Sequence, residues 1–246
     1  MVNFLIFAQT SPMKIQLPLW AFALGILILA ACNNNPAPTD QPGNTPAAPA
    51  DTAQSQQPDT EGVSEDYENT NRVIWQKPDL VLNLLGNLKG KTVADIGAGT
   101  GFFTLRLVQK ADKVIAIDVD PRFTSYLDSV KVLELPEHLQ GRLETRLAAP
   151  NNPKLGAEEV DVVVIVNTFM YLPNQVEYLR TLKKGLKPGG KLLIIDFKKK
   201  RTPVGPPVNI RTDLYTAEEA LYQAGFRNIT ANDTTLDYQY ILTALK

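Results

Sequence analysis

The 246-residue sequence has only one cysteine and one histidine, His138. A single cysteine excludes an intramolecular disulfide framework and a thiolate-rich zinc site, and a single histidine excludes a histidine-cluster metal site. A carboxylate-rich magnesium or calcium site stays open, but no residue is assigned to one, and His138, in an expected surface turn, takes no role. A basic excess is also missing, because 25 Lys and Arg accompany 26 Asp and Glu. We therefore expect no nucleic-acid partner, since such a protein needs excess positive charge to displace phosphate counterions.

Charges are scarcest at the amino terminus, where positions 1–60 hold one Lys and three Asp. Within them, Leu19 to Ala31 is uninterrupted apolar sequence. This segment has the length of a signal-peptide core and falls short of the roughly 20 residues of a membrane-spanning helix. Lys14 precedes it, and that charge bias keeps the amino end in the cytoplasm and sends the following chain across the membrane. The sequence predicts an extracytoplasmic domain, whether the segment is cleaved or retained.

The apolar segment ends in the tetrapeptide LAAC, Leu29 to Cys32, which resembles the lipobox of bacterial lipoprotein signal peptides. The resemblance implies that residues 1–31 are a cleaved signal peptide and that Cys32 becomes a lipidated first residue, which attaches the protein to a membrane. A start at Met13 would give a signal of ordinary length. Asn33 differs from the Asp that signals inner-membrane retention, so the resemblance favours the outer membrane where the source has one. The alternative is a chance cysteine in an apolar helix.

The next segment has almost nothing with which to build a core. Residues 33–60 contain six prolines and otherwise only Ala, Asn, Gln, Thr, Asp, Gly and Ser. Without a large aliphatic or an aromatic side chain, such a segment cannot offset its ordering entropy. We expect residues 32–60 to be a disordered, partly polyproline tether. One globular domain, residues 61–246, follows and is long enough for a single good core.

This domain alternates strands and helices. Residues 160–166 and 191–197 are apolar on both faces, as expected of strands inside a sheet that is covered on two sides. The alternation implies an α/β fold with an open, mainly parallel sheet and a ligand at the carboxyl ends of its strands. The other strands are expected at 92–96, 114–118, 143–147, 226–231 and 238–244, and helices at 61–75, 78–88, 102–110, 121–130, 175–186 and 217–224.

The most informative stretch is VADIGAGTG, Val93 to Gly101. Glycines at a strand-to-helix turn let the backbone come close to a ligand, and the start of the helix offers unpaired amides to a negatively charged group. A dinucleotide site would need a third small residue at the position of Phe102, so that pattern fails. What remains is an acidic residue followed by three alternating glycines.

Two acidic residues accompany the glycines. Asp95, at the end of the first strand, is poorly placed for phosphates but suited to an ammonium group. Asp118 ends the next strand, seventeen residues after Gly101. A carboxylate there can accept both hydrogen bonds of a ribose diol. The alternative for Asp118 is an ordinary helix-capping acid.

Together with LKPGG at residues 186–190, these motifs resemble those of the class I S-adenosylmethionine (SAM)-dependent methyltransferases over about residues 75–246. The resemblance implies a Rossmann-like fold, with a mainly parallel seven-stranded sheet and helices on both faces, and SAM as cofactor. It places the amino group of SAM at Asp95, the ribose at Asp118 and the methionine end near Asn167, for which an ordinary structural role is the alternative. The implied cofactor-binding residues are Asp95, Gly97, Gly99, Gly101, Asp118 and Asn167.

The sequence departs from the family in two places. LAAP, at residues 147–150, stands where relatives usually carry an acidic or polar residue that binds adenine. Residues 168–171 lack the histidine that many relatives offer as a base, which leaves Tyr171 as a weak catalytic candidate that could position an acceptor or simply pack. Methyl transfer does not strictly need a base, because alignment of the reacting groups supplies much of the rate. The basic run at 198–201 is a candidate rim for an anionic acceptor, with a solvated loop as the alternative.

Two functions follow. The first is a SAM-dependent methyltransferase that is lipid-anchored outside the cytoplasm and acts on a small molecule or an envelope component. The second is a non-catalytic lipoprotein that uses the same fold as a ligand- or protein-binding module. The first needs its cofactor supplied across a membrane, because SAM is made in the cytoplasm. The intact acidic-glycine loop and Asp118 favour the first, since a module without the cofactor has no need of them.

Overall fold

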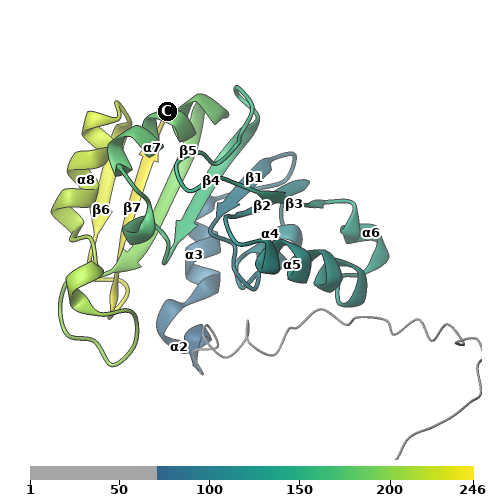
Figure 1. Ribbon diagram of the computed structural model, residues 1–246, viewed down its shortest axis with the longest axis horizontal. Helices are drawn as coiled ribbons and strands as arrows, with labels where there is room; N and C mark the ends of the chain where they lie inside the picture. Colours follow the sequence, from purple (N-terminus) through teal and green to yellow (C-terminus); the bar gives the residue numbers. More distant parts are fainter. Residues whose placement is uncertain (1–70) are drawn as a thin grey trace, which may run out of the picture. The chain divides into compact units, whose positions relative to one another are not determined.

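The computed structural model describes residues 71–246 (Figure 1). The predicted signal peptide, the lipidated Cys32, the tether and most of the helix predicted over residues 61–75 lie outside the described residues. No helix within residues 71–246 is long and apolar enough to cross a membrane.

The described chain is built on one seven-stranded sheet with the order β3-β2-β1-β4-β5-β7-β6. Strands β1 to β5 pair in parallel, whereas β7 runs antiparallel between β5 and β6. This arrangement confirms the predicted α/β class with a mainly parallel sheet. The strands are β1 (Thr92–Ile96), β2 (Lys113–Asp118), β3 (Leu143–Leu147), β4 (Val160–Val166), β5 (Leu186–Phe197), β6 (Arg227–Asn232) and β7 (Gln239–Leu245).

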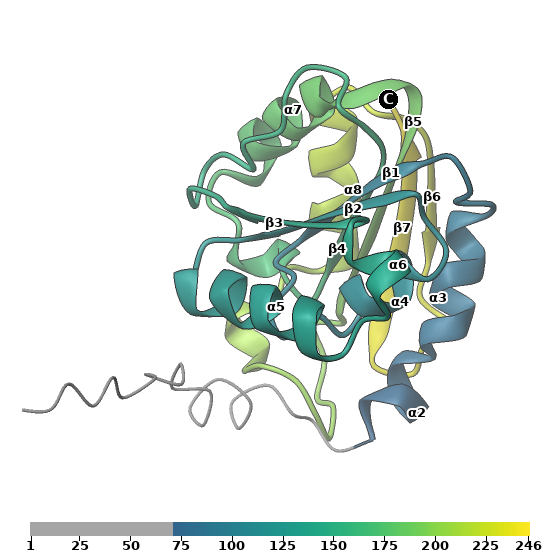
Figure 2. The same cartoon turned by 90° about the vertical axis from the view of Figure 1, so that its right-hand side faces the viewer.

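Helices cover both faces of the sheet (Figures 1 and 2). Side chains alternate along a strand, so β4 sends Val162 and Val164 into one apolar cluster and Val163 and Ile165 into another. The first cluster packs against α3, α4 and α5, and the second against α7 and α8. The helices are α2 (Arg72–Gln76), α3 (Pro78–Leu85), α4 (Thr104–Val108), α5 (Pro121–Leu133), α6 (Glu137–Gln140), α7 (Gln175–Gly185) and α8 (Leu214–Gln223), with short 3-10 helices η1 (Phe169–Tyr171) and η2 (Val208–Ile210).

Two elements begin earlier than predicted, because of contacts that the spacing of apolar residues does not show. Strand β5 begins at Leu186 instead of Lys191, because Leu186 already pairs with Val160 before the register shifts. Helix α8 begins at Leu214 instead of Ala217, since the side chain of the preceding Asp213 caps it by accepting the backbone N–H of Thr216 at 2.9 Å.

Two helical predictions also need correction. The helix predicted over residues 102–110 is shorter, because α4 begins only at Thr104, after the glycine turn has closed. The surface turn predicted around His138 contains the single helical turn α6, which buries Leu139. One buried leucine in a turn of four residues is too short a pattern to distinguish from a loop.

Candidate cofactor-binding site

A cavity of about 340 Å³ opens at the carboxyl ends of β1, β2 and β4. In an open α/β sheet this edge is where ligands bind, and it is the edge that the sequence predicts. The walls include the glycine turn after β1, the end of β2, the segment after β3, the end of β4 with η1, and helix α2. The lining includes Arg72, Gly97, Gly99, Asp118, Asn167 and Tyr171.

Two of the three motif glycines are required by close packing. Gly97 has a φ of 72° and approaches the β4 loop so closely that an added Cβ would lie 2.2 Å from Oγ1 of Thr168. Gly101 has a φ of 85°, and its Cβ would lie 2.6 Å from a methyl group of Leu127 in α5. Both positions therefore exclude larger side chains. Gly99 differs, because it faces open space and lines the cavity.

Asp118 is held between two backbone amides at the end of β2. Its Oδ2 accepts the N–H of Gly99 at 2.9 Å, and its Oδ1 accepts the N–H of Asp120 at 3.1 Å. The side chain is buried and lines the cavity. A carboxylate has about four lone-pair sites, so both oxygens keep acceptor capacity for a ligand. This geometry suits the predicted contact with a ribose diol.

Asp95 lies behind the glycine turn and is not part of the cavity wall. Its carboxylate is buried and accepts the hydroxyl of Thr104, the first residue of α4, at 2.7 Å. Burial raises the pKa of Asp95 to about 6, against the lowering effects of that hydrogen bond and of the nearby Arg72 charge. In this structure Asp95 fixes the start of α4 beneath the glycine turn, and its predicted contact with an amino group stays a prediction.

Asn167 directly follows β4 in a left-handed conformation, with a φ of 58°, and lines the cavity. Its Oδ1 accepts two side-chain amides, one from Gln76 of α2 at 3.4 Å and one from Gln239 of β7. The same Gln76 amide also donates to Oε1 of Gln239 at 3.2 Å. We call Gln76, Asn167 and Gln239 the amide cluster. Because Oδ1 is used by both glutamines, the NH2 group of Asn167 is the part available to a ligand.

Sequence reasoning missed both glutamines of the amide cluster. Each is fully buried and stands next to aromatic residues, in IWQ and YQY. A polar residue in such a context is a signal, because buried polar side chains are normally hydrogen-bonded. The partner was not visible, since Gln76 and Gln239 lie 163 positions apart.

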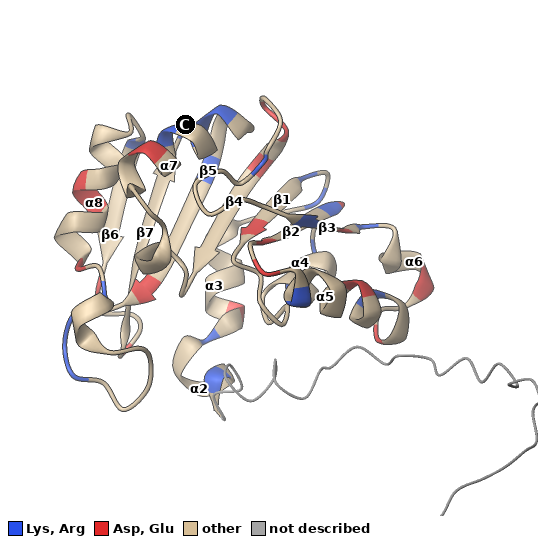
Figure 3. Ribbon diagram, viewed as in Figure 1, with Lys and Arg blue, Asp and Glu red and all other residues tan. Residues whose placement is uncertain are grey.

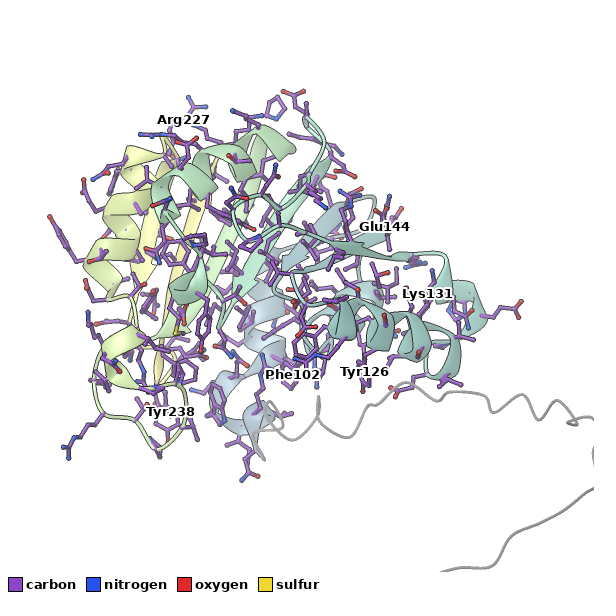
Figure 4. The ribbon with its side chains drawn as sticks, viewed as in Figure 1. Phe102, Tyr126, Lys131, Glu144, Arg227 and Tyr238 are labelled. Carbon is purple, nitrogen blue, oxygen red and sulfur yellow. The ribbon has the colours of Figure 1, made fainter. Side chains whose placement is uncertain are left out.

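Arg72 supplies a positive charge to the cavity wall. Its guanidinium carbon lies 4.1 Å from the ring centroid of Phe102 (labelled in Figure 4), and its Nε donates to Gln76. Arg106 of α4 lies at the same distance from the same ring but does not line the cavity. Burial lowers the pKa of Arg72 to about 10, so the group is a cation at neutral pH. Nothing in the sequence indicates this role, because Arg72 lies in the predicted helix 61–75, outside every motif of the site.

Tyr171 lies at the mouth of the cavity with 57% of its surface exposed. Tyr171 belongs to η1. The buried Asp196 of β5 holds this turn, because its Oδ2 accepts the N–H of Met170 at 3.0 Å. Burial raises the pKa of Asp196 to about 7. The side-chain amide of Gln175 also donates to the carbonyl of Phe169, at 2.9 Å. Tyr171 is therefore fixed at a position from which it can contact an acceptor.

The segment after β3 contributes Ala148 and Pro150 to the cavity wall. Lys198, Lys199 and Lys200 do not reach the cofactor cavity and line a separate depression, together with Asp213 and Tyr240. Among residues 71–246, no group of three or more His, Cys, Asp or Glu side chains could hold a metal ion.

Comparison with known proteins shows which family this domain resembles. Residues 94–194 match the family model described as a methyltransferase domain. The ubiquinone/menaquinone biosynthesis C-methyltransferase UbiE of Escherichia coli is 27% identical over 180 residues, which cover 70% of this chain and 65% of that protein. The chain thus spans just under two thirds of the length of the curated relatives that it matches.

Solved structures agree with this match. A SAM-dependent methyltransferase from Aquifex aeolicus is 28% identical, with a TM-score of 0.68 over 76% of this chain and 98% of that one. The phosphoethanolamine N-methyltransferase 2 of Haemonchus contortus, in complex with SAM, has the same fold, with a TM-score of 0.59 and 15% identity over 70% of this chain and 52% of that one. The protein therefore has a class I SAM-dependent methyltransferase domain with SAM as its cofactor, as the sequence predicts.

Proposed function

We propose that this domain transfers the methyl group of SAM to an acceptor at the mouth of the cavity, outside the cytoplasm, while Cys32 attaches the chain to a membrane through a lipid. The observation that carries the proposal is the meeting of Asp118, the glycine turn, Asn167 and Arg72 in one cavity of about 340 Å³. This volume lies at the lower end of the range for cofactor sites, so the acceptor is expected to approach from the mouth.

The residues of the cavity fit the parts of SAM. Asp118 keeps acceptor capacity for two ribose hydroxyls. Arg72 and the NH2 group of Asn167 offer donors for the carboxylate of the methionine end. The apolar surfaces of Ala148, Pro150 and Phe123, which also line the cavity, suit the flat adenine ring.

When bound, SAM supplies a methyl group on a positively charged sulfur, which is already a strong electrophile. The task of the protein is then to align an acceptor and to exclude water, and alignment alone can supply a large part of the rate. Tyr171 is the residue placed to position that acceptor, because it lies at the mouth on a turn fixed by Asp196. No step of this proposal needs a histidine base.

The acceptor is proposed to be a small molecule or a component of the cell envelope. One relative is a ubiquinone/menaquinone biosynthesis C-methyltransferase, so lipophilic aromatic compounds belong among the acceptors to be tested. Exposure of Tyr171 at the mouth supports an aromatic acceptor, because aromatic rings pack well against each other.

Calorimetric titration of the chain with SAM and with its demethylated product tests the proposal. We expect binding of both, and a tenfold to hundredfold loss in Asp118→Asn, because about 1.5–3 kcal/mol is typical of a hydrogen bond to a charged group. The control is Asp128→Asn, since Asp128 lies on the exposed face of α5 and bonds Thr145 at 2.6 Å, away from the cavity. Absence of binding at millimolar ligand would sink the proposal.

The lipid anchor needs its own experiment. Cys32→Ser should abolish incorporation of radiolabelled lipid, because Cys32 is the only thiol of the sequence. Unchanged lipid labelling in this variant would defeat the anchoring part of the proposal and leave the methyltransferase part standing.

A further inference from the structure

We infer that the methyltransferase domain carries a second membrane contact: a surface for an anionic lipid bilayer, formed by the loop after β5 and the exposed side of α2. We call it the docking face and define it by Val73, Ile74, Lys199, Lys200, Arg201, Val208 and Ile210. This inference does not depend on methyl transfer, although it would bring the mouth of the cavity to the membrane.

The charge of the loop is one-sided. Residues 197–212 contain five basic residues and no acidic one, and positions 198–201 are the only run of four consecutive basic residues in the sequence. The side chains of Lys199, Lys200 and Arg201 are exposed, and none of the ion pairs within residues 71–246 involves them. Figure 3 shows this loop as a blue stretch at one end of the sheet.

Acidic residues near the loop do not cancel this charge. Asp213 and Asp233 line the depression beside Lys198, Lys199 and Lys200. The carboxylate of Asp213 is already engaged at the start of α8, where it accepts two hydrogen bonds from Thr216. Asp237 also lies near Lys198, so the four basic side chains of residues 198–201 still exceed these three acidic ones.

Both elements of the docking face also carry exposed apolar side chains. Ile210 and Val208, in η2, are 41% and 36% exposed, and Ile74 and Val73, in α2, are 72% and 55% exposed. Exposed aliphatic residues next to Lys and Arg are the composition of segments that lie in a membrane interface, where the apolar groups enter the headgroup boundary and the cations meet anionic lipids. A nucleic acid or another free polyanion would use the charges but leave the aliphatic groups in water.

The loop is rigidly built, so its exposed side chains are held outward. Arg211 is 4% exposed, and its guanidinium donates to the carbonyls of Pro206, Lys198 and Lys200 at 2.8, 3.0 and 2.8 Å. The same group lies 5.1 Å from the ring centroid of Phe197. A buried arginine that satisfies three carbonyls fixes the path of the loop.

Phe197 also connects the loop to α2 and to the cavity edge. The ring of Trp75, in α2, lies 5.6 Å from the ring of Phe197, and the neighbouring Asp196 holds η1 with Tyr171. Both views of the fold place α2 and the loop at the end of the sheet where β4 and β5 finish (Figures 1 and 2). A bilayer on the docking face would therefore lie next to the mouth of the cofactor cavity.

A single fluorescent label in the full chain tests the contact. Because Cys32 is the only cysteine, a Cys32→Ser chain with Ile210→Cys carries one thiol for an environment-sensitive dye, and its apolar segment 19–31 keeps the chain on vesicles. We expect a blue shift of the emission on vesicles of equal phosphatidylglycerol and phosphatidylcholine. The shift should be absent on phosphatidylcholine alone and should be reversed by high salt, which screens the charges.

Two controls make the result specific. A dye at Tyr222→Cys, in the last turn of α8 and 55% exposed, should not shift, because it reports only the proximity that the amino-terminal segment imposes. Replacing all three residues at positions 199–201 by Ala should abolish the shift at position 210. Replacing Lys89, Lys110 and Lys131 by Ala removes the same amount of charge and should leave the shift at position 210 unchanged. These three lysines are exposed or half-exposed and precede β1, β2 and β3, at the opposite edge of the sheet.

The inference would be overturned by no shift at position 210 on anionic vesicles, by an equal shift at position 222, or by a shift at position 210 that is the same on anionic and on neutral vesicles. A shift that appears without vesicles and grows with protein concentration would also overturn it, because the face would then bind a second copy of the chain. None of these outcomes bears on SAM binding, which the calorimetric titration measures separately.

Discussion

The guanidinium carbon of Arg72 lies 4.1 Å from the centroid of the Phe102 ring. Phe102 is the residue that breaks the dinucleotide-binding pattern of the glycine loop, because a small residue would be needed there. In this fold the large ring is used: it supports, above the glycine turn, the cation that lines the cofactor cavity. Phe102 thus breaks the pattern of a dinucleotide site and also helps to hold Arg72, the residue that we expect to bind SAM.

The first prediction concerns this pair. Arg72→Gln should weaken SAM binding tenfold to hundredfold, because a charged hydrogen bond is lost. Phe102→Leu should weaken it by about two- to fivefold, the scale of one partly exposed cation–π contact. Calorimetric titration measures both. Arg106→Gln is the matched control, since Arg106 stacks on the same ring but does not line the cavity, and an equal loss there would contradict the assignment.

The second prediction concerns the amide cluster. Gln76→Leu or Gln239→Leu should each lower the free energy of unfolding by about 1–3 kcal/mol, because buried amide groups lose their partners. The double variant should lose less than the sum, since both glutamines serve Oδ1 of Asn167. Urea unfolding measures these values, with the exposed Gln223→Leu of α8 as the control. Strictly additive losses would show that the three side chains do not act as one network.

The third prediction is a pH dependence that comes from Asp196. Its pKa is raised to about 7 in the folded chain, whereas an unfolded aspartate titrates near 3.9. Between these values the folded state holds a proton that the unfolded state has lost, so the free energy of unfolding falls as the pH rises from about 4 to 7. Above the folded pKa no further loss comes from this group.

Asp196→Asn should remove this pH-dependent contribution, because an amide carries no charge. Its one oxygen can accept only one of the two backbone N–H groups, of Met170 and Phe197, that the carboxylate accepts, and that loss is the same at every pH. We therefore expect the variant to gain stability relative to the parent chain as the pH rises through this window, by a few kcal/mol at most. Chemical unfolding at a series of pH values measures the difference, and Asp128→Asn serves as the exposed control. A difference that does not change between pH 4 and 8 would contradict the raised pKa.

The fourth prediction separates two glycines of the same motif. Gly101→Ala should reduce the free energy of unfolding by about 1–3 kcal/mol, because its Cβ would lie 2.6 Å from Leu127 at a φ of 85°. Gly99→Ala meets no atom within 4 Å, so it should cost less stability but obstruct the cavity and weaken SAM binding. Thermal unfolding and calorimetric titration of both variants check this contrast, which would fail if both variants lost the same property.

The sequence predicted the sheet well because the information is local. Residues 160–166 and 92–96 are strands with the predicted bounds, since an apolar run between turn residues needs no distant partner to be recognised. The glycine turn and Asp118 could be predicted for the same reason, because they belong to a short stretch of sequence whose glycines are needed by the local backbone.

The missing parts of the site depend on distant contacts. Arg72 reaches the cavity only because α2 packs over Phe102, and Gln76 meets Asn167 across 91 positions. Asp196 looked like the polar end of a strand, and nothing in its neighbours showed that it would hold η1. Asp95 was found, but the direction of its side chain, toward Thr104 and away from the cavity, depends on packing that the motif does not specify.

The wall formed by Ala148 and Pro150 has a consequence for the range of cofactors. Neither side chain can donate or accept a hydrogen bond, so an adenine ring placed on this side, as we propose, would be held by shape and by contact with its faces. We therefore expect the protein to distinguish SAM from other sulfonium nucleosides mainly through the sugar and the amino acid. Analogues of SAM with a changed purine, such as the inosine form or one bearing a substituent on the exocyclic amine, should be accepted nearly as well as the natural compound.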